Sequence, residues 1–135
     1  MKKTLFGLIM ALAATMLLSS CKKDNAELIL GSWTNTAESC EITIAGLREL
    51  PAGIISMEFT SDSVLIYDDR VNCIPEWHHY TLAKQAGKLM LQVEEPFAYA
   101  PSDFEVEQLD KEQLVLVCPE NDIDVGFRYV MHRTK

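Results

Sequence analysis

Eight short segments of this chain alternate between apolar and polar residues, and this alternation constrains its fold more than any other feature. A period of two is typical of strands that bury one face. In the segment 55–60, Met57 and Phe59 share one face while Glu58 lies on the other. The remaining predicted strands cover 31–36, 63–67, 76–82, 88–93, 103–108, 112–118 and 124–133. No long helical pattern competes, so the sequence predicts an all-β domain.

The connections between these segments indicate how the strands are arranged. Tight turns are predicted at Ser61-Asp62, at 83–87 and at Asp110-Lys111. Eight strands with short connections favour an up-and-down antiparallel barrel, because closure leaves no free sheet edge. A two-sheet β-sandwich is the alternative. The segment 25–30 could form a short helical turn before the first strand, and 41–46 could be an extra strand or part of a long loop.

The first 21 residues have the layout of an export signal. Lys2 and Lys3 precede an apolar run over 5–18, and the run ends in Leu18-Ser19-Ser20-Cys21. The run is short of the roughly 20 residues that a spanning helix needs. The last four residues resemble the lipobox of bacterial lipoproteins. This resemblance implies that 1–20 is a signal peptide, removed before Cys21, and that Cys21 carries acyl chains such as palmitate that anchor the protein to a membrane.

The residues after Cys21 are also similar to the starts of lipoproteins from Bacteroidetes-type bacteria. The resemblance implies a lipid-anchored protein of the cell envelope, expected at the outer membrane, with the periplasmic or surface face left open. Residues 21–27 would be a lipidated tether and 28–135 a single barrel domain, which is enough chain for one small core.

The net charge of the mature chain limits the classes of molecule that it can be expected to bind. The chain has 12 basic and 20 acidic residues, and the signal peptide removes Lys2 and Lys3 but no acidic residue. The mature net charge is therefore −10. Such an acidic excess argues against binding nucleic acid. It favours solubility, and attraction to cationic partners stays open.

Two motifs on the first and last strands resemble those of lipocalins. Gly31-Ser32-Trp33 resembles the G-x-W that opens the lipocalin fold, and the cadence of 57–62, 104–109 and 114–116 is similar to that of small lipocalin-like lipoproteins of Bacteroidetes. The resemblance implies that a basic side chain of the last strand packs over Trp33 at the closed end of the barrel. Arg133 is the first candidate and Arg128 the second. The domain is shorter than a typical lipocalin and has no helix after the barrel, so a wide cavity is not implied.

Two functions follow from such a barrel. In the first, the barrel binds a small apolar ligand at the cell envelope. The candidate lining residues are Met57, Phe59, Ile66, Trp77, His79, Met90, Phe104, Val106, Leu114, Leu116 and Phe127, and those singled out as ligand-binding are Met57, Phe59, Trp77, His79, Phe104, Leu116 and Phe127. An eight-stranded barrel is just wide enough for side chains or one small ligand, so these residues could equally fill a core.

In the second function, a filled barrel acts as a structural or interaction module. An up-and-down topology places the connections 37–54, 68–75, 94–102 and 119–123 at the open end, opposite the tight turns. These loops are rich in carboxylates, among them Asp68-Asp69 and Glu94-Glu95, which are expected to be solvated rather than catalytic. Loops on a rigid scaffold commonly form binding rims. The acidic rim would then bind an envelope protein or a glycan.

Motifs for catalysis, cofactors and metals are missing from the sequence. It contains no G-x-S-x-G, P-loop, G-x-G-x-x-G or calcium-loop pattern. Cys73 lies near His78 and His79 but without metal-ligand spacing. We therefore predict a non-enzymatic protein without cofactor or metal. Export permits one disulfide among Cys40, Cys73 and Cys118, and the sequence leaves the pair open.

Overall fold

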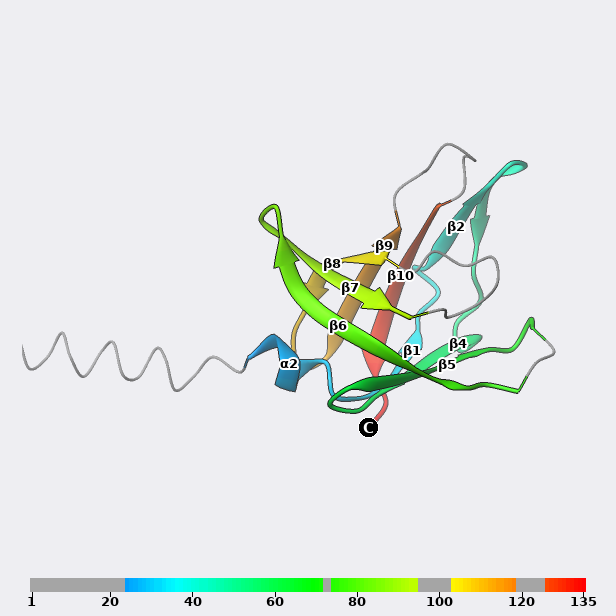
Figure 1. The fold of residues 1–135 in the computed structure, drawn as a ribbon. Helices are drawn as coiled ribbons and strands as arrows, with labels where there is room; N and C mark the ends of the chain where they lie inside the picture. The colour runs from blue at the N-terminus through cyan, green and yellow to red at the C-terminus, as the bar shows by residue number, and fades with distance from the viewer. Residues whose placement is uncertain (1–23, 72–73, 95–102, 119–125) are drawn as a thin grey trace, which may run out of the picture.

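The structure is a computed structural model that describes residues 24–71, 74–94, 103–118 and 126–135, to which the following account applies. These residues form one short helix, α2 (Asn25–Leu28), and ten strands (Figure 1). The strands are β1 (Gly31–Asn35), β2 (Cys40–Thr43), β3 (Gly46–Glu49), β4 (Ile55–Phe59), β5 (Ser63–Asp68), β6 (Trp77–Gln85), β7 (Lys88–Val93), β8 (Asp103–Leu109), β9 (Gln113–Cys118) and β10 (Gly126–Arg133). Within this part of the chain, no helix has the length and apolar character to cross a membrane.

Eight of the strands close into a barrel. They follow the order β1-β4-β5-β6-β7-β8-β9-β10, and β1 returns to pair with β10. Every one of these pairings is antiparallel. The predicted up-and-down barrel is confirmed, and the alternative of a β-sandwich is wrong. Each of the eight strands overlaps a segment that the period-two alternation predicts.

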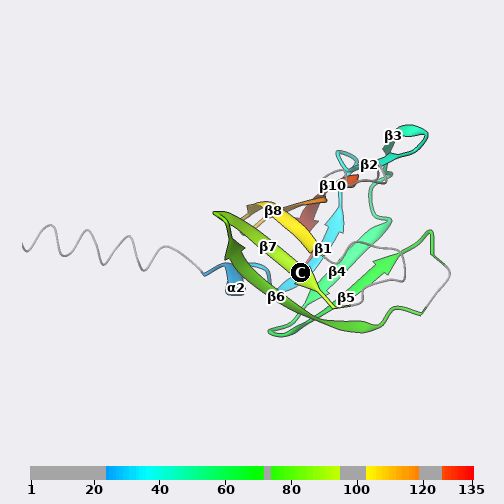
Figure 2. The same cartoon turned by 45° about the horizontal axis from the view of Figure 1, so that its top comes forward.

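The hairpin of β2 and β3 is an addition to the barrel. β1 pairs with β10 only as far as Asn35, which lies opposite Met131. Beyond that point β2 takes over as the neighbour of β10, with Cys40 opposite Arg128. The hairpin therefore extends the sheet past the open end, while α2 lies at the other end of the molecule (Figures 1 and 2). An extra strand near 41–46 is thus correct, and so is the helical turn at 25–30, but β3 is not anticipated by the sequence pattern.

The inward faces of the strands form one apolar core. Several side chains of the core have no surface open to water, among them Ile29, Trp33, Leu91, Leu114, Leu116 and Met131. A side chain without such surface borders no water-sized void, so the core around these residues is packed like the interior of an ordinary globular protein. Burial of these apolar groups drives the closure of the sheet.

The closed end is sealed by Trp33 and Arg133. The Trp33 Nε1–H donates to the carbonyl oxygen of Ile29 at 2.8 Å. The guanidinium of Arg133 lies over the indole, with its carbon 4.2 Å from the ring centroid, which is a cation–π geometry. Arg128, the second candidate for this position, instead faces outward, and its Nε lies 3.4 Å from a carboxylate oxygen of Glu107.

The glycine of the G-x-W motif has a steric reason. Gly31 has a φ of 111°, a backbone angle that residues with a side chain rarely adopt. A Cβ at this position would lie 2.7 Å from Arg133 Nη1 and 2.7 Å from the carbonyl oxygen of Lys135. Only glycine allows the first strand to begin this close to the end of the last. The spacing of Gly31 and Trp33 therefore follows from how the two ends of the domain meet.

Candidate functional site

The residues singled out as ligand-binding lie on both sides of the barrel wall. Those that face the interior are Met57, Phe59, Phe104, Leu116 and Phe127, all of them buried. Trp77 and His79 face solvent instead, because Trp77 lies opposite Leu65 and His79 opposite Ser63, both on the outer face of β5. The expectation that Trp77 and His79 line the interior is wrong.

The inward side of β6 is taken by His78 and Tyr80. The Tyr80 ring packs edge-on against Phe59, with ring centroids 5.2 Å apart, and its hydroxyl donates to the carbonyl oxygen of Thr60 at 2.6 Å. This non-local packing decides which face of the strand points inward. Met90, another expected lining residue, also faces outward, opposite Ala83.

Around the interior candidates the barrel is largely filled. Met57, Phe59 and Leu116 have almost no surface open to water, so no ligand-sized space adjoins them. Toward the open end, Phe127 stacks on Tyr129 with ring centroids 3.9 Å apart and packs at 5.5 Å against Phe104. Phe127 retains 9% of its surface. Solvent therefore reaches the interior at its open end.

A polar network spans the open end of the barrel. The Tyr129 hydroxyl donates to Glu41 at 3.2 Å. Arg70 donates to both Glu41 oxygens, at 2.9 and 2.8 Å, and to Asp68 from Nε at 3.0 Å and Nη2 at 2.8 Å. We call Glu41, Asp68, Arg70 and Tyr129 the rim network. It joins β2, β5 and β10, which are not adjacent along the chain.

Contacts within the rim network shift the pKa values of Asp68, Arg70 and Tyr129. Burial alone would raise the pKa of Asp68, but the hydrogen bonds and charge of Arg70 outweigh it and lower that pKa below its usual range. Hydrogen bonds from Arg70 to Asp68 and Glu41 raise the pKa of Arg70 further. Burial and the Glu41 carboxylate raise the pKa of Tyr129. Asp68 is thus a paired carboxylate, which corrects the expectation of a solvated charge.

Exposed aliphatic side chains flank the rim network. Ile44 and Leu47, at the turn between β2 and β3, are 87% and 72% exposed, and after β5 Ile74 is 88% exposed and Val71 is also open to solvent. We call these four residues, which form two pairs on separate segments, the rim patch. These residues were not predicted from the sequence, although a signal exists: Ile44 belongs to the turn Ile44-Ala45, and Leu47 follows Gly46 directly after it.

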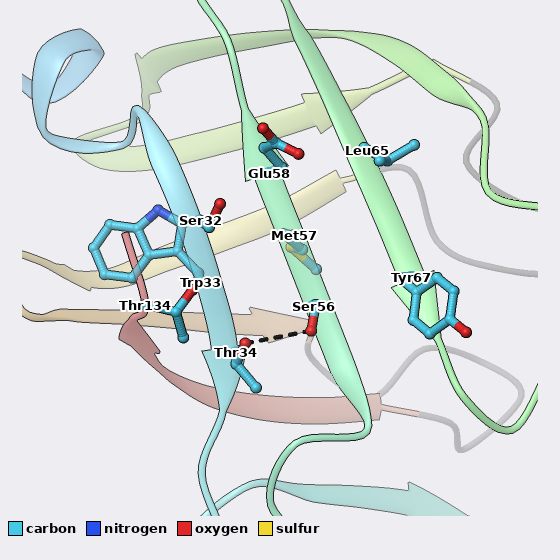
Figure 3. A pocket seen from close by; sticks show the side chains of 9 residues that line it. All are labelled: Ser32, Trp33, Thr34, Ser56, Met57, Glu58, Leu65, Tyr67 and Thr134. Atoms are coloured by element: carbon cyan, nitrogen blue, oxygen red, sulfur yellow. Dashed lines mark hydrogen bonds between the residues drawn. The ribbon is translucent and has the colours of Figure 1, made fainter.

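A shallow hollow lies on the outer wall of the barrel. Its volume is about 170 Å³, and its lining comprises Ser32, Trp33, Thr34, Ser56, Met57, Glu58, Leu65, Tyr67 and Thr134 (Figure 3). Thr34 and Ser56 share a hydrogen bond of 3.3 Å between their hydroxyls. Because the strands alternate, Ser32, Thr34, Ser56, Glu58, Leu65 and Tyr67 all belong to the outward face, so this hollow is separate from the barrel interior.

The cysteines of the domain do not all share one face. Cys118 points into the core, while Cys40 lies opposite the outward-facing Arg128, and the two are not joined to each other. Burial and the charge of Asp103 raise the pKa of the Cys118 thiol. Cys73 lies outside the described residues, as do Glu95 and most of the predicted loops 94–102 and 119–123. In the described part, no three His, Cys, Asp or Glu side chains gather as metal ligands would.

Comparison with known proteins gives limited similarity. Neither a protein-family model nor a curated protein matches the chain. A lipocalin-like protein from Bacteroides uniformis ATCC 8492 has a similar solved structure, with 12% identity and a TM-score of 0.48 over 78% of this chain and 97% of that one. An uncharacterized protein from Bacteroides eggerthii DSM 20697 is similar with 14% identity and a TM-score of 0.45 over 77% of this chain and 98% of that one. The assignment of a closed eight-stranded barrel rests on the strand pairing of this chain itself.

Proposed function

We propose that this chain is a lipid-anchored, non-enzymatic protein of the bacterial cell envelope whose filled barrel presents the rim patch to an envelope protein. The observation that carries the proposal is a contrast in exposure. The interior around Trp33 and Leu116 has no accessible surface, whereas Ile44 and Ile74 at the rim stand almost fully in solvent. Large aliphatic side chains that stand in solvent at one end of a filled barrel form the apolar surface that we expect a partner to cover.

The position of the tether supports this orientation. Asp24 precedes α2, which lies at the closed end (Figure 1). Cys21 is three residues earlier, so a fully extended chain spans about 11 Å between them. Acyl chains on Cys21 would hold the closed end next to the membrane. The rim patch would then face away from the membrane, toward other proteins.

The rim network makes the rim suitable for burial against a partner. When a partner covers an unpaired charge, the loss of its hydration costs roughly several kcal/mol. Glu41 and Asp68 are already paired with Arg70, so a partner that covers them buries no lone carboxylate. The sheet order also ends at β3 within the described residues, and the outer edge of β3 is available to a partner strand.

The proposal is tested by site-specific photo-crosslinking in a host that exports and lipidates the full chain. A photoreactive residue at position 44 or 74 should give one adduct of defined mass, and Leu47→Asp should abolish it while Leu47→Met should keep it. Matched controls at positions 84 and 111, which are exposed near the closed end, should give no such adduct. Equal adducts from both ends, or none from the rim, would contradict the proposal.

A second candidate is the binding of a small apolar ligand at the open end of the interior. The aromatic cluster of Phe104, Phe127 and Tyr129 favours it, because this cluster lies where the interior meets solvent. A fluorescent fatty-acid analogue titrated into the full chain should then bind saturably. Phe127→Trp would crowd the cluster and weaken this binding, whereas Ile44→Asp would leave it unchanged.

A further inference from the structure

We propose that the outer wall of the barrel, across β1, β4, β5 and β6, carries a saccharide-binding site. We call it the wall site, and it consists of Ser32, Thr34, Ser56, Glu58, Leu65, Tyr67 and Trp77. It is independent of the rim patch, since it uses outward side chains of the barrel wall. The register of four neighbouring strands divides the site into an apolar half and a polar half.

The register arranges the wall site as two rows. In the first row Ser32 lies opposite Glu58, Glu58 opposite Leu65, and Leu65 opposite Trp77. In the second row Thr34 lies opposite Ser56, and Ser56 opposite Tyr67. Directly opposed side chains in antiparallel sheets have Cβ atoms about 5 Å apart, and diagonal neighbours about 7–8 Å. The polar side chains are therefore direct cross-strand neighbours of the apolar ones. Figure 3 shows the members from β1, β4 and β5 around the hollow.

The half of the wall site on β5 and β6 is aromatic and aliphatic. Tyr67 is 47% and Trp77 50% exposed, and they are diagonal neighbours beside Leu65. Large aromatic side chains contribute strongly to binding because they bury much apolar area with few rotatable bonds. Two half-exposed rings on adjacent strands provide apolar surface on which a ligand can lie.

The half on β1 and β4 is polar and has unused hydrogen-bonding capacity. Thr34 and Ser56 share one hydrogen bond of 3.3 Å, which leaves one of the two O–H donors and acceptor positions on both oxygens for a ligand. The Ser32 hydroxyl and the Glu58 carboxylate make no side-chain hydrogen bond or ion pair among the described residues. This half can therefore both donate to and accept from a ligand.

A sugar ring matches this division better than other ligands do. A pyranose has apolar C–H faces, which can lie on an aromatic ring, and hydroxyl groups along its edge. The hollow of about 170 Å³ is smaller than the ~300–1,000 Å³ of pockets that enclose drug-sized ligands, so it suits one sugar unit of a longer chain. The polar half contains three hydroxyl groups and a single carboxylate, that of Glu58. This composition favours a neutral hydroxylated ligand over an organic cation.

The two tryptophans of the chain provide a direct readout. Trp33 is fully buried at the closed end, whereas Trp77 belongs to the wall site. The full chain, in a detergent without a sugar headgroup, is titrated with cellobiose, maltose, chitobiose and mannobiose while iodide quenching of tryptophan fluorescence is recorded. At least one disaccharide should protect the exposed tryptophan from quenching saturably. Trp77→Phe should remove this signal, which would show that Trp77 is its source.

Variants then separate stacking from hydrogen bonding. Tyr67→Ala and Glu58→Gln should each weaken binding roughly tenfold or more, the loss expected for one strong contact. Thr81→Ala, on the outer face of β6 away from the hollow, should have no effect. The proposal is overturned if no disaccharide protects Trp77, if Tyr67→Ala leaves binding unchanged, or if spermidine protects Trp77 and the sugars do not. The last result would assign the wall site to organic cations.

Discussion

The Arg133 guanidinium lies 4.2 Å above the Trp33 ring and also donates to the carbonyl oxygens of Leu28, Leu30 and Lys111. One side chain of the last strand thus holds the helix that precedes the first strand and the turn between β8 and β9. The three carbonyls lie at the ends of elements, where backbone acceptors lack regular partners. This arrangement seals the closed end and fixes where the tether leaves the domain.

Removing the guanidinium should destabilise the domain. Arg133→Met loses the charge-assisted hydrogen bonds and leaves carbonyls unsatisfied, which should lower the free energy of unfolding by about 2–3 kcal/mol in urea denaturation. Arg128→Met is the control, because its exposed pair with Glu107 should contribute only ~0–1 kcal/mol. Equal effects of the two variants would mean that Arg133 does not seal the barrel.

Gly31→Ala should be more harmful than Gly53→Ala. Both glycines have positive φ, so both substitutions introduce backbone strain of roughly 1 kcal/mol or more. Only at position 31 does the new Cβ meet Arg133 and Lys135 at 2.7 Å, whereas nothing lies within 4 Å of it at position 53. Thermal unfolding of the two variants measures the difference. A Tm of Gly31→Ala equal to that of Gly53→Ala would contradict the close approach of the two ends of the domain.

The rim network should weaken in acid. Because the folded-state pKa of Asp68 lies below the ordinary value of 3.8, its contribution to stability is complete above that value and is lost as the pH falls through the folded pKa. Arg70→Met should therefore destabilise the protein more at about pH 6 than at about pH 3, as urea denaturation at both values would measure. Lys84→Met, on the exposed end of β6, is the control and should show no such difference. If Arg70→Met lowers stability equally at both pH values, the ion pairs of Arg70 do not contribute to stability.

Truncating a central interior side chain should be costly if the barrel is filled. Leu116→Ala should lower the free energy of unfolding by about 2–5 kcal/mol, because packed neighbours cannot collapse into the space. Leu65→Ala, on the outer wall, should cost less than about 1 kcal/mol. Similar small losses for both would indicate that Leu116 borders a void.

The barrel could be predicted from the sequence because alternation is a local signal. Each strand carries its own inward and outward residues, as Met57, Glu58 and Phe59 illustrate, and the turns limit which strands can be neighbours. The Gly31-Ser32-Trp33 motif likewise indicated the contact with Arg133, and the structure supplies its steric and hydrogen-bonding reasons.

Features that depend on distant partners could not be predicted in the same way. On β6 both faces carry aromatic and histidine residues, so only the contact of Tyr80 with Phe59 decides which face is inward. The pairing of Arg70 with Glu41 joins residues 29 positions apart. The same holds for buried Asn35, whose amide accepts from Ile55 N–H at 2.8 Å and donates to the Pro51 carbonyl at 2.9 Å. Composition predicts exposure for such a residue, and only the loop that closes over it makes its burial favourable.

Native mass spectrometry of the full chain, purified from an exporting host and released from detergent in the instrument, tests the central claim of a filled barrel most directly. If the barrel is filled, the spectrum should show the mass of the lipidated chain with no further small molecule, in both gentle and denaturing conditions. An additional apolar mass that is present in gentle conditions and lost on denaturation would contradict it. That result would move the function from the rim into the barrel.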